Sequence, residues 1–173
     1  MDDRADLAAG ADQGDALVDA LAQTTFAVTA RLNRLGAEHD LSLTQLRVLA
    51  ILRDRDRVRI TALAQHLGLE KSTMTGLVDR GVRRGLLERT ASAGDRRAVD
   101  VLLTRAGRDL AERLHEAAAT SMTGMAQGLS APERQRLTAL LTRLLPPEPR
   151  STARCDRPWA PSLSKGGAGD GAA

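Results

Sequence analysis

Hydroxyl and cationic side chains are concentrated between residues 71 and 97 of this chain. That segment holds seven Lys or Arg against three acids, whereas residues 1–20 hold six Asp and one Arg. Lys and Arg bind phosphate oxygens, and Ser or Thr hydroxyls hydrogen-bond phosphates or base edges. A positive field confined to one segment is what a nucleic-acid interface requires. On charge alone, a solvated Arg-rich surface is the alternative interpretation.

The periodicity of this region predicts two short helices that would carry those groups. Thr61 is a candidate N-cap for the first helix, and Gly68 is expected to end it with a positive φ. The second helix starts near Glu70 and ends at Gly85. Each helix has one apolar face, formed by Leu63, Ala64 and Leu67 in the first and by Met74, Leu77, Val78 and Val82 in the second.

Two short strands are predicted after the second helix, at residues 86–90 and 99–102, with a basic loop at residues 91–97 between them. Val58 and Ile60, two apolar residues separated by one position, could add a short third strand to this hairpin. Two helices joined by a glycine turn and followed by a basic hairpin predict a winged helix-turn-helix.

The same stretch resembles a known family. LAQHLGLEKSTMTGLVDRGVRRGLLER, followed by GDRRAVDVLLTRAG, is similar to the MarR family of dimeric winged-helix transcriptional regulators. The resemblance covers residues 17–145. Its most specific pieces are Asp95-Arg96-Arg97 followed by Leu103-Thr104 and Gly107, Asp79-Arg80 ahead of Gly85, and Leu43-Thr44-Gln45 before Val48-Leu49.

The predicted fold is mainly α with a small β-hairpin wing, a winged helix-turn-helix domain plus long terminal dimerisation helices. Residues 1–14 are expected to be a flexible acidic arm, and residues 15–145 the MarR-like domain. Within it, residues 15–39 and 104–145 form the dimerisation helices, and residues 43–103 form the winged helix-turn-helix. The Pro, Gly, Ser and Ala content after residue 145 predicts a disordered tail at residues 146–173.

Apolar periodicity in both terminal regions indicates a partner. Leucines recur with valine between Leu17 and Leu35, on a helix of about 35 Å, which is longer than a small winged domain needs. Near the other end, Ser130 to Glu133 is a capping box, with a proline in the first turn. Leucines at i, i+3, i+4, i+7 and i+8 then run from Leu137 to Leu145. We expect both apolar faces to form the interface of a homodimer.

Candidate DNA-contacting residues follow from these placements. Exposed side chains at the start of a groove-binding helix read base edges, whereas cations farther along bind phosphates. For Ser72 and Thr73, simple capping of the first helical turn is the alternative. The resemblance implies that Arg97 enters the minor groove and that Asp95 orients it; without the resemblance these are solvated charges of a turn. The full set is Thr61, Lys71, Ser72, Thr73, Thr75, Gly76, Arg80, Arg83, Asp95, Arg96 and Arg97.

Two glycines depart from the family pattern. Gly76 stands where many members carry a longer polar or basic side chain, and Gly81 stands where they usually carry Leu. A glycine inside a helix costs about 1 kcal/mol relative to alanine, and Gly81 would also leave the core without a side chain. The base specificity of the family therefore does not transfer to this chain.

Composition excludes several other classes. Aromatic residues are 1% of the chain, so the core is expected to be aliphatic and helical. The single cysteine, Cys155, excludes an intramolecular disulfide and a Cys-cluster metal site. No apolar run approaches the ~20 residues of a membrane span, and the acidic N-terminus does not resemble a signal peptide. We expect a soluble cytoplasmic protein.

Neither a metal, a cofactor nor an enzymatic activity is predicted. His39, His66 and His115 are far apart and lack metal-ligand spacing. No phosphate-binding glycine loop, catalytic triad or paired carboxylates stand out. The alternating charges of residues 53–57 are expected to form a solvated loop.

The function predicted is that of a homodimeric, sequence-specific transcriptional regulator, expected to be a repressor that binds a palindromic double-stranded operator. The resemblance implies a small-molecule effector between the dimer helices and the winged domain, although few aromatic residues other than Phe26 could stack on a phenolic ligand. One alternative is a nucleoid-type DNA-binding protein with little sequence preference. Another is a protein-interaction module with a degenerate winged fold, against which the retained cations argue.

Overall fold

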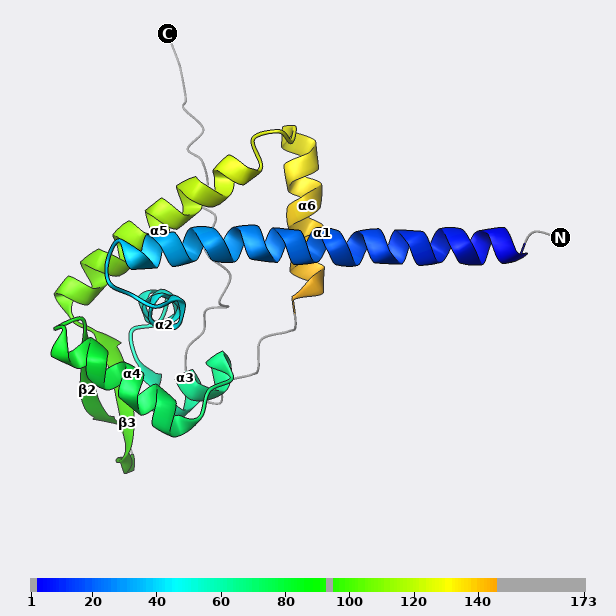
Figure 1. Cartoon of the computed structure of the whole chain (residues 1–173). Helices are drawn as coiled ribbons and strands as arrows, with labels where there is room; N and C mark the ends of the chain where they lie inside the picture. Colours follow the sequence, from blue (N-terminus) through cyan, green and yellow to red (C-terminus); the bar gives the residue numbers. More distant parts are fainter. Residues whose placement is uncertain (1–2, 93–94, 146–173) are drawn as a thin grey trace, which may run out of the picture.

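The computed structural model describes residues 3–92 and 95–145, with side chains at residues 14–92 and 98–145 (Figure 1). The disordered tail predicted at residues 146–173 lies outside the described residues. The elements in chain order are α1 (Asp3–Ala37), α2 (Leu43–Arg53), β1 (Val58–Arg59), α3 (Ile60–Leu67), α4 (Lys71–Arg83), β2 (Leu87–Ser92), β3 (Asp95–Leu103), α5 (Arg105–Met125) and α6 (Ala131–Leu144). The mainly helical fold with a small hairpin wing is confirmed.

The first helix is longer than predicted. α1 begins at Asp3 and not near Asp15, so the segment expected to be a flexible arm is helical from Asp3 onward. Alanine is the strongest helix former, and lengthening an existing helix avoids the cost of a new nucleus. Figure 1 shows the N-terminal part of α1 extending beyond the other helices. At its other end Gly36 is buried, and a Cβ there would lie 2.5 Å from the Leu41 carbonyl oxygen.

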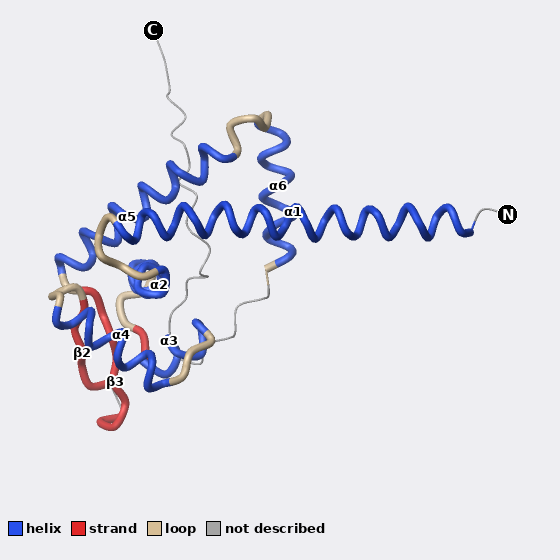
Figure 2. Tube along the Cα trace, in the orientation of Figure 1, coloured by secondary structure: helices blue, strands red, loops and turns tan. Residues whose placement is uncertain are grey.

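A three-stranded antiparallel sheet, in the order β1–β3–β2, carries the wing. Val58 pairs with Val101 and Arg59 with Asp100, and Leu87 at the start of β2 pairs with Leu103. Figure 2 shows the β2–β3 hairpin projecting beyond the helices. The third strand predicted around Val58 is therefore present, but Ile60 already belongs to α3.

Side-chain caps fix three of the helix starts. Ser42 forms a capping box with Gln45 at the start of α2, and Ser130 forms one with Glu133 at the start of α6. The hydroxyl and the backbone N–H of Ser130 both donate to the carboxylate of Glu133, and these two hydrogen bonds lower the pKa of Glu133. Thr104 accepts a 3.0 Å hydrogen bond from the Gly107 N–H at the start of α5.

Thr61 is not the N-cap that the sequence predicted. The N-cap of α3 is Arg59, which makes no side-chain capping hydrogen bond, and Thr61 lies half-buried inside the first turn. The chain enters this helix directly from β1, so the sheet already fixes the backbone that a capping side chain would otherwise hold.

The core gathers the inner faces of α2 to α5 against the sheet. Its most deeply buried large side chains are Leu52, Leu63, Met74, Val78 and Val101. Val82, which the sequence placed on the apolar face of the second helix, is instead 40% exposed. Eight residues advance an α-helix by more than two full turns, so a residue at i+8 has drifted away from the face defined at i. Among the described residues, no helix has the length and hydropathy needed to span a bilayer.

The glycine at position 81 does not leave the core empty. A Cβ at Gly81 would lie 2.5 Å from Cδ1 and 2.8 Å from Cγ of Leu87. The side chain of Leu87, from β2, therefore occupies the space that a larger residue on α4 would need. This corrects the expectation that the core lacks a side chain there.

Candidate nucleic-acid interface

The turn between α3 and α4 fixes how α4 is presented. Gly68 adopts a φ of 65°, and the Leu69 N–H donates to the Ala64 carbonyl at 2.9 Å. Met74, Leu77 and Val78 then pack α4 against the core. Because these three residues hold one face inward, the opposite face of α4 is directed away from the domain.

That outward face carries most of the residues that the sequence selected. Lys71, Ser72, Thr73, Arg80 and Arg83 are exposed, whereas Thr75 and Gly76 are half-buried. Thr61 lies on α3 and does not share this face.

The side-chain hydroxyls on this face differ in their bonding. No hydrogen bond from the side chain of Ser72 or Thr73 is formed within the described part of the chain, so the capping role considered for them is not seen. The Thr75 hydroxyl donates to the Lys71 carbonyl at 2.8 Å, which leaves its methyl group and an oxygen lone pair as its outward chemistry.

Arg89 of β2 ties the wing to the middle of α4. Its Nη2 lies 2.8 Å from Asp79 Oδ1 and donates to the Thr75 carbonyl at 3.2 Å. The sequence analysis did not select Arg89, because a pairing ten positions apart across a helix end has no periodic signature. The bond fixes the hairpin against α4, so the two parts present one continuous surface.

The basic segment after Gly94 lies on a strand and not in a loop. β3 begins at Asp95, so Asp95, Arg96 and Arg97 lie on this strand, close to the hairpin tip. Ala91 pairs with Val99 and Ser92 with Asp95, so Arg96 and Arg97 lie in a bulge between two paired positions. The pairing of Ser92 with Asp95 follows a register shift between Ala91 and Ser92. Such irregularities bend a hairpin and increase its twist, and backbone pairing extends as far as partners are available. The loop predicted at residues 91–97 is therefore wrong at residues 91–92 and 95–97, whereas residues 93 and 94 lie outside the described residues.

The charge run at residues 53–57 is solvated only in part, since Asp56 is exposed but the Arg53 side chain is not. After this run, in β1, Arg59 Nη2 donates to the hydroxyl of Ser92 at 3.2 Å, which places this cation beside the end of β2. Arg108 of α5 lies 3.6 Å from Asp56. The side chain of Arg53 is only 7% exposed, and its Nε and Nη2 both donate to Asp54 Oδ1, at 2.8 and 2.6 Å.

A pocket of about 190 Å³ lies among α1, α2, α3 and α5. Apolar side chains form most of its wall, together with the polar Arg47, Arg53, His66 and His115. Arg53 Nη1 is buried and has no hydrogen-bond partner among the described residues. The charge of Arg53 is paired with Asp54, but its Nη1 is a buried donor without an acceptor, which is costly, so an acceptor oxygen would complete its hydrogen bonding. No sequence pattern indicates the pocket, because its four polar residues come from three different helices.

These elements define a winged helix-turn-helix protein. A short helix and a glycine turn present α4, whose outward face bears hydroxyls and cations, and an adjacent hairpin is bonded to it through Arg89. This is the geometry in which a helix enters the major groove and a hairpin reaches the flanking groove.

Comparison with known proteins places the chain in a family. The model of the MarR family matches residues 41–99. The transcriptional repressor IacR of Pseudomonas putida is 30% identical over 121 residues, which cover 70% of this chain and 72% of IacR. The chain belongs to the MarR family of transcriptional regulators.

Two solved structures share the fold. A mutant of Escherichia coli MarR in complex with operator DNA matches with a TM-score of 0.61 and 26% identity over 76% of this chain and 93% of that one. BpsR of Bordetella bronchiseptica, whose DNA binding is regulated by 6-hydroxynicotinic acid, matches with a TM-score of 0.62 and 26% identity, over 73% and 90% of the two chains. These relatives are regulators of transcription, and none is an enzyme.

Proposed function

We propose that this chain is a homodimeric cytoplasmic repressor that binds a palindromic operator, with α4 in the major groove and the hairpin in the minor groove. The observation that carries the proposal is the outward face of α4. Its hydroxyls and cations point away from the domain, while the opposite face of the helix is buried in the core. The complex of Escherichia coli MarR with operator DNA supports operator binding by this fold, and the name of IacR supports repression.

The outward-facing residues of α4 form two groups, according to the part of the DNA that each is placed to contact. Lys71, Ser72 and Thr73 lie in the first turn, where a recognition helix contacts base edges. Arg80 and Arg83 lie in the last turns and suit phosphates, which set register without specifying sequence. At Gly76 a Cβ would meet only Arg80 Nη1, at 3.8 Å, so this glycine leaves room for close approach of the helix to a base pair.

Selection of bound duplexes from a random pool, at one fixed salt concentration, tests the proposal. We expect enrichment of an inverted repeat with half-sites about 10 base pairs apart, one helical turn. Bound DNA without an enriched sequence would favour the nucleoid-type alternative, in which phosphates alone provide the affinity. The absence of any duplex binding would favour the interaction module.

Replacement of Arg97 with Ala is expected to weaken operator binding by about 1–3 kcal/mol, more on A·T-flanked than on G·C-flanked sites. The reason is that a narrow A·T-rich minor groove concentrates negative potential and attracts Arg, and that Arg97 lies on β3 close to the hairpin tip. The measurement is the dissociation constant on the two flanks at one salt concentration. Equal losses on both flanks would make Arg97 a plain phosphate contact.

We further propose that an organic anion is the effector and that it binds the pocket walled by Arg53. Its carboxylate would accept from the buried Nη1 of Arg53 after a small movement of that side chain, and its body would contact Leu32, Leu49 and Leu114. Phe26 does not line this pocket and is 72% exposed, so aromatic stacking is not expected. The regulation of BpsR by a carboxylic acid supports this ligand class.

Replacement of Arg53 with Met is expected to abolish the response to the anion. In the parent, 6-hydroxynicotinic acid at saturation should weaken operator binding by about tenfold, within the usual range of coupling between two sites, and its neutral amide should have no effect. The control is Arg47→Met, which removes an exposed cation from the same wall. Competition binding measures both variants. A response retained by Arg53→Met, or equal for acid and amide, would contradict the proposed contact.

A further inference from the structure

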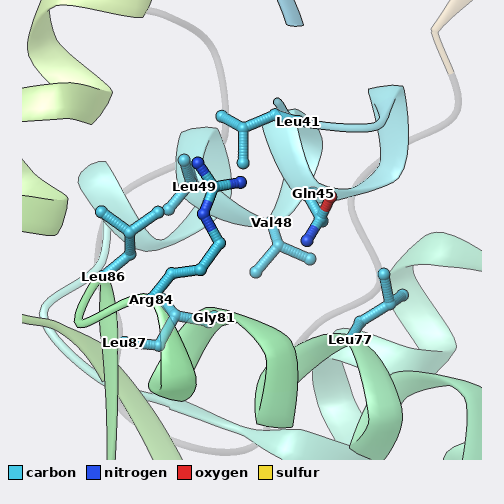
Figure 3. A pocket seen from close by; sticks show the side chains of 9 residues that line it. All are labelled: Leu41, Gln45, Val48, Leu49, Leu77, Gly81, Arg84, Leu86 and Leu87. Atoms are coloured by element: carbon cyan, nitrogen blue, oxygen red, sulfur yellow. The ribbon is translucent and has the colours of Figure 1, made fainter. Parts of the chain in front are cut away.

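The guanidinium of Arg84 joins the end of α4 to the end of α1. Its Nη1 donates to the Asp40 carbonyl at 2.6 Å, and its Nη2 donates to the His39 carbonyl at 2.8 Å. Figure 3 shows the Arg84 side chain reaching from the end of α4 toward Leu41. Two charge-assisted bonds to two successive carbonyls use the fork geometry that distinguishes arginine from lysine.

The loop that receives Arg84 is rigidly attached to α1. The Leu41 N–H donates to the Gly36 carbonyl at 2.8 Å, and Leu41 itself is buried in the core. Asp40 adopts a φ of 53°, a left-handed conformation that its own carbonyl bond to Arg84 helps to hold. A shift of the α1 C-terminus would therefore carry the two accepting carbonyls with it.

The other end of this link is equally rigid. Arg84 continues the hydrogen bonding of α4, since its N–H donates to the Arg80 carbonyl at 3.1 Å. The next two residues are held by the residue that caps α5: the Thr104 hydroxyl donates to the Gly85 carbonyl at 2.6 Å, and the Thr104 N–H to the Leu86 carbonyl at 3.1 Å. The turn at residues 84–86 is thus bonded to the start of α5 on one side and to the end of α1 on the other.

We propose that Arg84 is a positioning residue that sets the placement of α4 relative to α1, and through it the half-site spacing that the dimer accepts. The inference rests on the proposed homodimeric operator binding and goes beyond it, because the Arg84 guanidinium bonds to the carbonyls of His39 and Asp40 and is not one of the groups proposed to contact DNA. Both long helices meet the recognition helix at this one turn. Loss of the Arg84 bonds frees α4 from α1 while the contact face of α4 stays intact.

The neighbouring Arg83 provides a matched control. Arg83 is also exposed and differs from Arg84 by one position, but it lies on α4 among the proposed phosphate contacts. A lost phosphate contact weakens binding to every spacing alike and reduces the slope of log K against log salt by about 1 per protomer, or about 2 for the dimer. A lost positioning contact changes the preference among spacings and leaves that slope unchanged.

The experiment uses the operator recovered with the full-length parent, and derivatives with one base pair inserted or deleted between the half-sites. The parent is expected to prefer the recovered spacing by about tenfold or more, and Arg84→Ala to reduce that preference to below about threefold with an unchanged salt slope. Arg84→Lys, which can bond only one carbonyl well, should restore part of the preference. Arg83→Ala should keep the parental preference among spacings but show a smaller slope of log K against log salt.

Hydrogen exchange of the DNA-free protein gives a second, independent measurement. Arg84→Ala is expected to speed exchange of the amides at residues 38–41, including the Leu41 N–H, whereas Arg83→Ala leaves them as in the parent. The inference would be overturned if Arg84→Ala left the exchange of amides 38–41 unchanged. It would also be overturned if that variant kept the parental preference among spacings, or if it reduced the slope of log K against log salt. If the parent itself shows no preferred spacing, the proposed palindromic binding fails, and exchange at 38–41 still decides whether Arg84 holds the loop.

Discussion

Replacement of Gly107 with Ala is expected to lower the free energy of unfolding by about 3 kcal/mol or more, among the largest effects of a single substitution. Gly107 is buried in the first turn of α5, where it meets the backbone of Leu86. A Cβ at this position would overlap the Leu86 carbonyl oxygen and lie 2.9 Å from its carbonyl carbon. Backbone atoms held by hydrogen bonds on both sides cannot move away as a flexible side chain could.

The matched control is Gly124→Ala in the same helix. A Cβ at Gly124 would meet nothing within 4 Å, so this change should stabilise the protein by up to about 1 kcal/mol through helix propensity alone. Urea unfolding at one fixed protein concentration measures both variants, since the stability of a dimer depends on concentration. A Gly107→Ala protein as stable as the parent would show that α5 can shift away from the α4–β2 turn without loss.

Local signals in the sequence predicted the elements of the winged domain well. Met74, Leu77 and Val78 repeat with the helical period and are buried, Gly68 takes the positive φ expected of it, and Ser130 caps α6. Each of these depends on residues within about one helical turn, the range over which periodicity and capping act. This is why the helix-turn-helix could be located, and its outward face named, before the structure was known.

The contacts that orient the elements were not predictable in this way. Arg84 bonds to carbonyls 44 and 45 positions earlier, and Arg89 bonds across a helix end to Thr75 and Asp79. An arginine in a basic segment has the same sequence signature whether it binds a carbonyl, a carboxylate or a phosphate. From the sequence, Gly81 likewise predicts a missing core side chain, whereas in the structure the side chain of Leu87 fills that space.

The described part of the chain leaves a large apolar surface of the terminal helices uncovered. α6 has no buried residue, and Leu140 and Leu144 are 48% and 64% exposed. Leu17 and Leu21 of α1 are exposed as well, whereas Leu35 packs against the core of its own chain. An isolated helix of this length is marginal in water, so α6 needs packing that the described residues of this chain do not supply. A second copy of the chain is the partner that the family and these faces both favour.

We therefore expect the parent to sediment as a dimer at micromolar concentration, and a Leu140→Glu, Leu144→Glu variant to sediment as a monomer or to unfold. Four leucines per dimer would lose burial, each worth about 1.5 kcal/mol or more, and four carboxylates would take their place. The double variant Gln135→Glu, Thr142→Glu is the control, because it adds the same two charges per chain to exposed positions of α6 outside the leucine stripe and should leave the dimer intact. A parent that is a folded monomer at these concentrations, or a leucine double variant that still dimerises, would exclude the α6 face from the interface. Operator affinity should fall together with the dimer, since one protomer can occupy only one half-site.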